Sequence, residues 1–324
     1  MRGLVIKSTG TSYGVHFEDG TYADCHVKGN FRIRGIRSTN PVAIGDYVEV
    51  KTENTNDRLS NGELTHWITE VYERKNYIIR RATNLSYASH ILAANVDMAA
   101  LIVTVRHPET STTFIDRFLA TCEAYRVPAC LIFNKIDLLK DKEQQELATL
   151  RQLYESLGYS TYAISALNDA ATINDKLSSL FYGKVTLLSG NSGVGKSTLL
   201  NAILGENVAR TGAISSAHHK GMHTTTFSEM YPLKYAEQNN SNSWIIDTPG
   251  IKGFGILDME KEEIGHYFRE IFHISRECRY SDCIHMNEPG CAVNQAVIDG
   301  NIALSRYESY LSMLDDTTEG KYRK

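Results

Sequence analysis

The chain has 324 residues, which at about 150 residues per domain predicts two or three domains. A hydrophobic fraction of 42% excludes wholesale disorder, and 34 Lys and Arg against 38 Asp and Glu give a net charge of −4, which excludes a generally basic nucleic-acid-wrapping protein. No run of 18 apolar residues and no export signal is visible, so we expect a cytoplasmic protein without a membrane span.

Residues 1–75 consist of short alternating runs rich in Val, Ile and Tyr, separated by Gly, Asn and Asp. The runs are LVIKST, SYGVHFE, TYADCHV, FRIRGI and DYVEVKT. About five short strands with this spacing predict a small closed barrel. We favour an OB-like barrel, although an SH3-like barrel is nearly as compatible.

Residues 76–253 change to alternating strands and helices, which predicts an α/β domain with a largely parallel sheet covered on both faces. Strands are expected at 98–105, 129–133, 161–165 and 184–190, helices at 114–125, 141–157, 172–181 and 197–204, and two further strands in TFSEMYPL and SWIIDT.

The final part, residues 254–324, has a mostly helical pattern in EKEEIGHYFREIF and again over 293–314. A cysteine-rich segment separates these two stretches. The chain is therefore expected to contain a barrel, an α/β domain and a helical C-terminal domain.

A phosphate-binding loop is predicted at 190–197, GNSGVGKS, between an apolar strand and a helix. Glycines allow backbone N–H groups to approach phosphate oxygens, and the helix N-terminus favours the negative charge. Lys196 is expected to reach the β- and γ-phosphates, and Ser197 to hold Mg²⁺. The residues expected to surround the phosphates are Gly190, Asn191, Ser192, Gly193, Val194, Gly195, Lys196, Ser197 and Thr198.

Guanine is favoured over adenine by N-K-x-D at the end of a predicted strand, which consists of Asn134, Lys135, Ile136 and Asp137. The Asp137 carboxylate can accept hydrogen bonds from the guanine ring N–H and amine, and adenine would leave it unpaired at a cost of about 1–3 kcal/mol. Ser165-Ala166-Leu167 resembles the loop whose backbone N–H supports the guanine oxygen.

A D-x-x-G switch motif is predicted at Asp247-Thr248-Pro249-Gly250, after the apolar SWII. Asp247 is expected to hold Mg²⁺ through a water, and the Gly250 N–H to contact the γ-phosphate. The segment GMHTTT supplies a switch threonine for Mg²⁺, for which its resemblance to the GTPase switch motif favours Thr225, with Thr224 and Thr226 close enough to stay open.

The motifs occur in the order N-K-x-D, SAL, phosphate loop, HTTT and D-x-x-G, whereas the usual GTPase begins with the phosphate loop. The same site can form because β–α units that pack in one sheet can be rejoined at new chain ends. The order therefore predicts a circularly permuted GTPase domain. Since D-x-x-G leads directly into the C-terminal segment, we also expect loss of the γ-phosphate to reorient the C-terminal domain.

Half of the six cysteines lie within 14 residues, together with a histidine. Cys278, Cys283, His285 and Cys291 supply three thiolates and one imidazole, which is enough for a closed tetrahedral zinc site. Such a site leaves no position for water, so one structural Zn²⁺ is expected, with a disulfide or chance clustering as alternatives. The scattered Cys25, Cys122 and Cys130 are expected in the core.

Two acid-free segments carry the local positive charge. The first lies between Asp24 and Asp46 and the second between Glu73 and Asp97, and both contain aromatic residues. This mixture fits RNA backbone contacts and base stacking, although a solvated charged face is the alternative. The cations expected to contact RNA are Lys28, Arg32, Arg34, Arg37, Arg74 and Lys75.

The whole chain resembles the RsgA family of bacterial small-subunit-dependent GTPases, also called YjeQ or YloQ. The resemblance rests on ILAANVD, IDRFL, FNKIDL, GNSGVGKSTLLN, TGAIS, HTTT, DTPGIKGFG and the segment GCAVNQAVIDGNIALSRYESYLSML. It implies GTP hydrolysis stimulated by the 30S subunit, a late role in maturation of that subunit, binding to 16S rRNA near the decoding region, and zinc in the last domain. We expect a monomer.

The water-orienting Gln that follows D-x-x-G in many GTPases is absent, because Ile251 stands there. Slow turnover is therefore expected until another group orders the water. His223 in the switch loop is our candidate, with loop packing as its alternative role. Two other functions stay open: an RNA-binding protein for which GTP is only a docking ligand, and a GTP switch that recruits a protein partner.

Overall fold

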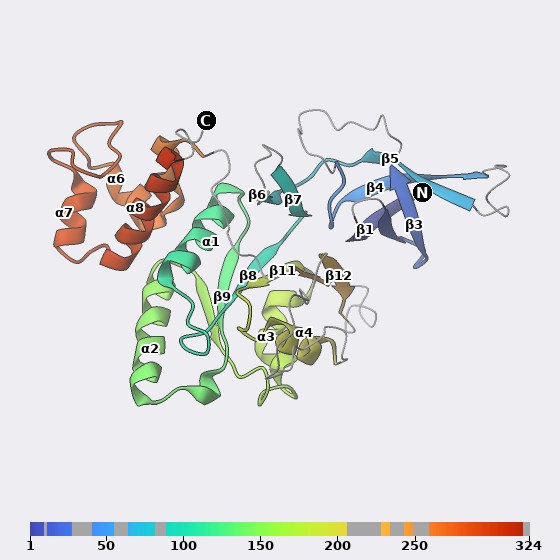
Figure 1. Ribbon diagram of the computed structural model, residues 1–324, viewed down its shortest axis with the longest axis horizontal. Helices are drawn as coiled ribbons and strands as arrows, with labels where there is room; N and C mark the ends of the chain where they lie inside the picture. The colour runs from blue at the N-terminus through green and yellow to red at the C-terminus, as the bar shows by residue number, and fades with distance from the viewer. Residues whose placement is uncertain are drawn as a thin grey trace, which may run out of the picture. The chain divides into compact units, whose positions relative to one another are not determined.

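The computed structural model describes residues 1–9, 12–27, 41–54, 64–81, 89–205, 228–233, 243–248 and 259–319 (Figure 1). The chain divides into two compact units. The first unit comprises Met1–Ala99, Ala170–Ser189 and Lys196–Ile251, and the second comprises Ala100–Asp169, Gly190–Gly195 and Lys252–Lys324. The predicted domain boundaries at residues 75 and 253 stay predictions.

The barrel in the first unit has five strands, β1 (Arg2–Ser8), β2 (Tyr13–Phe17), β3 (Tyr22–Val27), β4 (Tyr47–Asn54) and β5 (Leu64–Val71). They pair in the order β1-β2-β3-β5-β4, and a further β1–β4 pairing closes the sheet. The β3–β5 pair is parallel and the others are antiparallel. This arrangement confirms the OB-like barrel.

The barrel core follows from the alternation of each strand, which turns one face inward. Every strand contributes at least one buried residue to it, among them Val5, Val15, Cys25, Val48 and Ile68. The predicted strand FRIRGI lies outside the described residues, whereas β5 was not predicted.

The sheet of the first unit continues from β1 through three further strands, β12 (Glu229–Pro232), β13 (Trp244–Asp247) and β11 (Val185–Gly190). Strand β12 is antiparallel to both of its neighbours, and β11 and β13 are parallel. Two helices, α3 (Ile173–Phe181) and α4 (Lys196–Leu204), and a hairpin of β6 (Tyr77–Arg81) and β7 (Ser89–Ala94) complete the described elements of this unit.

The second unit contains the strand order β10-β9-β8, in which β9 and β10 are parallel. Its α/β elements are β8 (Met98–Val103), α1 (Thr112–Ala124), β9 (Ala129–Phe133), the 3-10 helix η1 (Ile136–Leu138), α2 (Asp141–Ser156) and β10 (Ser160–Ala163). Strand β8 begins two residues before this unit does. The strands and helices expected from the alternating pattern are thereby confirmed.

The C-terminal part of the second unit is helical, as predicted, with η2 (Lys261–Tyr267), α6 (Arg269–Ser275), α7 (Ala292–Ile298) and α8 (Leu304–Glu319). The stretch expected at 293–314 is thus divided into α7 and α8. Among the residues described, no helix combines the length and the apolar character that crossing a bilayer requires.

A buried ion cluster joins helix α1 to these C-terminal helices. Arg306 of α8 donates to Asp116 of α1 (Nη1 to Oδ1, 2.7 Å) and to Glu270 of α6 (Nε to Oε1, 2.6 Å). Tyr154 of α2 also donates to Asp116 at 2.9 Å. The side chains of Arg306 and Asp116 are 1% and 0% exposed, so these charges depend on one another.

Candidate functional site

The phosphate loop lies between buried strand β11 and helix α4, as the motif requires. Gly193 and Gly195 have φ values of 85° and 94°, which L side chains rarely adopt. A Cβ atom on Gly195 would lie 2.4 Å from the Asn134 amide nitrogen. The glycines therefore permit both the turn and a close approach to the N-K-x-D segment.

Asn134 joins three of the predicted motifs within the second unit. This residue directly follows β9 and is 3% exposed. Its Nδ2 donates to the Val194 carbonyl at 2.8 Å, and its Oδ1 accepts from the Ala166 N–H at 2.9 Å. The N-K-x-D, SAL and phosphate-loop segments are thereby held at one place, although they are widely separated along the chain.

Lys135 reinforces this link through its ammonium group. The residue adopts a left-handed conformation, with φ 62°, and its Nζ donates to the carbonyls of His107 (2.5 Å) and Gly193 (2.7 Å). Partial burial lowers the pKa of Lys135, and nearby Asp137 opposes the shift. Asp137 itself lies on η1 and is exposed, so its carboxylate is accessible to a ligand.

Lys196, Ser197 and Asp247, which the sequence predicts on the magnesium side of the nucleotide, lie in the first unit. The ammonium of Lys196, at the start of α4, donates to the carboxylate of Asp247 at the end of β13, and both side chains are buried. Burial raises the pKa of Asp247, whereas the charge of Lys196 lowers it. Ser197 and Thr198 follow on α4 and are half-buried.

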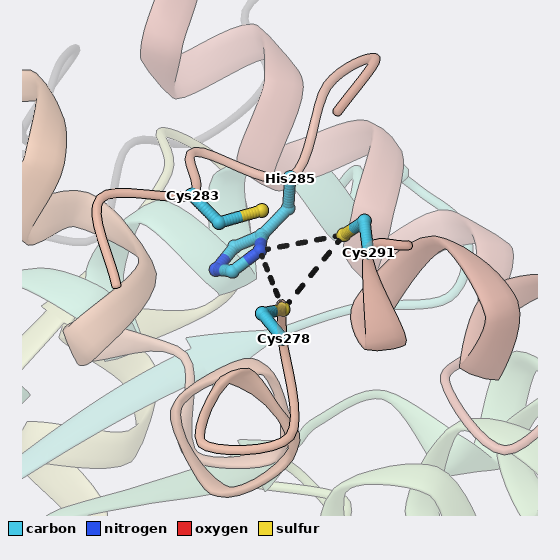
Figure 2. A group of neighbouring side chains, drawn as sticks. All are labelled: Cys278, Cys283, His285 and Cys291. Atoms are coloured by element: carbon cyan, nitrogen blue, oxygen red, sulfur yellow. Dashed lines mark hydrogen bonds between the residues drawn. The ribbon is translucent and has the colours of Figure 1, made fainter. Parts of the chain in front are cut away.

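The cysteine-rich segment brings all four predicted ligands together (Figure 2). The atoms that could coordinate an ion lie within 4.8 Å of one another. His285 Nδ1 is 3.6 Å from the sulfurs of Cys278 and Cys291, which are themselves 4.0 Å apart. A tetrahedral zinc with ordinary bond lengths needs ligand separations of about 3.5–3.8 Å, so the histidine–sulfur distances match this ion and a small inward movement of the sulfurs would complete the site.

The cysteines of this cluster are free thiols, which removes the disulfide alternative. Burial raises the pKa of Cys283 to about 12 and lowers the pKa of His285. The neutral imidazole is the form that coordinates metal, and the thiols must lose their protons on binding. The Asn294 N–H donates to the Cys291 sulfur at 3.4 Å, a bond that favours the thiolate.

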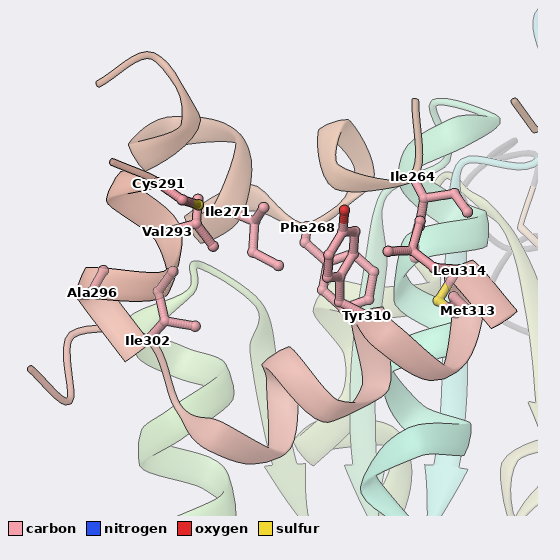
Figure 3. Packing of buried hydrophobic residues seen from close by; sticks show 11 residues of the cluster. Ile264, Phe268, Ile271, Cys291, Val293, Ala296, Ile302, Tyr310, Met313 and Leu314 are labelled. Carbon is pink, nitrogen blue, oxygen red and sulfur yellow. The ribbon is translucent and has the colours of Figure 1, made fainter. Parts of the chain in front are cut away.

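The cluster is supported by the C-terminal core, which includes Cys291 itself (Figure 3). Sequence spacing missed two residues that shape the cysteine loop. Glu288 accepts from the Ile284, Met286 and Asn287 N–H groups, and Tyr307 donates to the His285 carbonyl at 2.6 Å. Neither residue belongs to a spacing motif, and only the turn-forming N-E-P-G segment hints at the loop.

Comparison with known proteins identifies the family over most of the chain. The model of the RsgA GTPase matches residues 71–257, and that of the RsgA N-terminal domain matches residues 2–58. The chain belongs to the RsgA GTPase family.

Relatives and solved structures agree with this membership. A protein of Phocaeicola vulgatus named small ribosomal subunit biogenesis GTPase RsgA is 58% identical, with 100% of this chain and 99% of the relative covered. A Christiangramia forsetii protein of the same name is 47% identical, with 100% and 98% covered. The crystal structure of YjeQ from Thermotoga maritima has a TM-score of 0.71 at 32% sequence identity, with 100% of this chain and 99% of that chain covered. The crystal structure of YloQ, a circularly permuted GTPase, has a TM-score of 0.70 at 28% identity, with 100% of this chain and 96% of that chain covered.

Several of the predicted site residues lie outside the described residues. They are His223, Thr225 with its alternatives Thr224 and Thr226, and Gly250 of the switch segments, and Lys28, Arg32, Arg34 and Arg37 of the first basic segment.

The two remaining RNA-contact candidates of the RsgA-like barrel differ in environment. The Arg74 side chain is 7% exposed and bonds both carboxylate oxygens of Asp46, each at 2.6 Å. The Lys75 side chain is 56% exposed, and its ammonium pairs with Asp97. The geometry therefore favours Lys75 over Arg74 as a surface cation.

Proposed function

We propose that this protein binds GTP, hydrolyses it to GDP and phosphate, and acts on the 30S ribosomal subunit late in its maturation. Family membership and relatives named small ribosomal subunit biogenesis GTPase support the proposal. We further propose that the 30S subunit stimulates hydrolysis, and that the protein works as a monomer in the cytoplasm.

The observation that carries the proposal is the pair of hydrogen bonds that the Asn134 side chain makes, one to the phosphate loop and one to the SAL segment. These bonds hold the N-K-x-D segment beside the loop at 190–195 despite the permuted order of the motifs, which supports the proposal that Asp137 reads guanine. The residues proposed to bind GTP are Asn134, Lys135, Ile136, Asp137, Ser165, Ala166, residues 190–195, Lys196, Ser197 and Thr198.

Hydrolysis requires in-line attack of water on the γ-phosphate, with charge neutralisation and positioning as the main contributions. Lys196 neutralises charge on the phosphates, and the Gly250 N–H holds the γ-phosphate. His223 positions the water in our proposal, since Ile251 cannot. Ser197, Thr225 and Asp247 hold Mg²⁺, which when bound neutralises the β- and γ-phosphate oxygens.

The cluster of Cys278, Cys283, His285 and Cys291 holds one structural Zn²⁺ in our proposal. The ligand separations and the N–H bond to the Cys291 sulfur support this ion. Zinc would supply four bonds that join the loop after α6 to the start of α7, and these bonds would add to the small apolar core of the C-terminal helices.

The proposed contact with 16S rRNA uses the barrel and its exit segment. Lys28, Arg32, Arg34 and Arg37 would bind phosphates together with the exposed Lys75, whereas the buried Arg74 supports the site by holding Asp46. Segments that carry cations without acidic residues suit RNA contact by a protein whose net charge is −4.

The test is GTP turnover with and without purified 30S subunits over a salt series, for the wild type, Lys196→Ala and His223→Ala. We expect stimulation that weakens as salt rises, loss of about a hundredfold or more in Lys196→Ala, and loss of stimulated turnover in His223→Ala. GTP binding without stimulated turnover would instead favour an RNA-binding protein for which GTP is a docking ligand. Normal turnover in His223→Ala would remove the role of that residue alone.

A further inference from the structure

Strand β12 lies between the barrel and the strand that ends in Asp247. Its residue Glu229 is opposite Lys7 of β1 on one side and opposite Asp247 of β13 on the other. Directly opposed residues of antiparallel strands place their side chains on the same face of the sheet. Lys7, Glu229 and Asp247 therefore form one row across three strands of the first unit.

Glu229 is held from the barrel side by a charge. The Lys7 ammonium lies 3.2 Å from Glu229 Oε1, with the two side chains 45% and 39% exposed. Tyr231 of the same strand donates to Glu229 Oε2 at 3.0 Å. The carboxylate thus has two defined partners, one of which belongs to the barrel.

On its other side, Glu229 faces a buried carboxylate of like charge. Asp247 is 3% exposed and bonded to Lys196 of α4, so the row continues with charges in the order positive, negative, negative, positive. Like charges at neighbouring cross-strand positions repel, and Lys7 offsets this repulsion. The charge that balances Glu229 therefore comes from the barrel.

The barrel also occupies what would otherwise be an open sheet edge. Without β1, strand β12 would present unpaired backbone groups. A second contact accompanies the pairing, since the ring of His16 of β2 meets the ring of Trp244 of β13 edge-on at 5.4 Å. Two adjacent strands, β12 and β13, thus contact the barrel, and in sequence β12 begins four residues after Thr225.

We propose that Lys7 and Glu229 are positioning residues that couple the barrel to Asp247 during GTP hydrolysis. This inference rests on the proposed function, in which the barrel contacts the 30S subunit. A barrel held by the subunit fixes β1, the Lys7–Glu229 ion pair holds β12 in register on β1, and the pairing of β12 with β13 then positions Asp247, which Lys196 contacts.

The test compares Lys7→Glu, Glu229→Lys and the double variant Lys7→Glu/Glu229→Lys in the full chain. The readout is the ratio of turnover at saturating 30S subunits to turnover alone, together with the subunit concentration that gives half-stimulation. Each single reversal should lower the ratio by about fivefold, which equals about 1 kcal/mol, and the double variant should return it to within about twofold of the wild type. Lys51→Glu, a reversal at an exposed position of β4, should leave the ratio unchanged.

The charge exchange separates coupling from other roles. If Lys7 only contacts RNA phosphate, the double variant stays as defective as Lys7→Glu, and the proposal is wrong. Wild-type ratios in both single variants also overturn it. If 30S subunits do not stimulate GTP turnover in the wild type, both the proposed function and the coupling are wrong. If they stimulate the wild type and the two single variants equally, only the coupling is wrong.

Discussion

Substitution of Arg306 by Met tests whether the buried ion cluster fixes helix α8 on α1. Met has a similar length and no charge, so the variant removes the guanidinium while filling much of its volume. Asp116 and Glu270, 0% and 9% exposed in their side chains, would lose their shared cation. The cation–π contact with Phe268, at 4.6 Å from the ring centroid, would be lost as well.

The expected cost follows from this burial. Removal of one partner from a buried ion pair costs about 3–5 kcal/mol, because the remaining charge is left uncompensated. A domain has only about 5–15 kcal/mol of net stability, so helix α8 should open far more often. Amides of residues 304–314 should lose protection from hydrogen exchange by about a hundredfold to several thousandfold.

The loss should also depend on pH. Burial raises the pKa of Asp116, and Arg306 opposes that rise in the wild type. Without Arg306 the folded-state pKa rises further above the unfolded value of about 3.9. At a pH below the unfolded-state pKa, Asp116 is neutral in both states and does not destabilise the fold. As the pH rises through the folded-state pKa, the buried carboxyl loses its proton, and the free energy of unfolding falls. The variant should therefore be weakened more at pH 8 than at pH 5.

Two controls make the experiment decisive. Arg117→Met removes a partly exposed pair between the same two helices, with Asp316, and should cost less than about 1 kcal/mol. Arg306→Met combined with Asp116→Asn and Glu270→Gln should recover much of the loss, because no buried charge remains. Equal loss in Arg306→Met and Arg117→Met, or a loss that does not change with pH, would refute the reasoning.

Two further predictions concern the nucleotide and the metal. In Asp137→Asn the affinity for GTP should fall about tenfold to a hundredfold, while the affinity for xanthosine triphosphate should rise, because the asparagine amide can donate to the xanthine carbonyl. Binding titrations that show an unchanged nucleotide preference would contradict this prediction. Removal of zinc by a chelator should lower the melting temperature of the C-terminal helices, and elemental analysis should find one metal ion released per chain. The variant Cys283→Ala should retain less metal. Chelation that leaves the melting temperature unchanged would count against zinc.

Much of the nucleotide site was predictable because its motifs are local. GNSGVGKS and N-K-x-D each specify their chemistry within a few residues, and the flanking apolar runs place them at strand ends. The cysteine–histidine cluster was predictable for the same reason, since spacing alone collects three cysteines and a histidine. Prediction failed for β5 and for the carboxylate of Glu288, because long-range pairing and loop hydrogen bonds leave no periodic signal.

The basic segments mark where local reading is weakest. Arg74 and Lys75 are adjacent and look alike in sequence, but only the fold separates a buried partner of Asp46 from an exposed cation. Burial is decided by whichever segments pack against a side chain, and those segments come from elsewhere in the chain.

The sequence by itself indicated the chemistry of this protein: its patterns divide it into a barrel, a permuted GTPase and a cysteine-bearing helical end, and two acid-free segments concentrate positive charge in a chain of net charge −4. Tertiary structure alone decided the OB-like closure through the β3–β5 and β1–β4 pairings, the junction of three motifs at Asn134, and the row that joins Lys7 to Asp247. The physical reason is that motifs depend on neighbours in the chain, whereas strand register and buried charge pairs depend on neighbours in space.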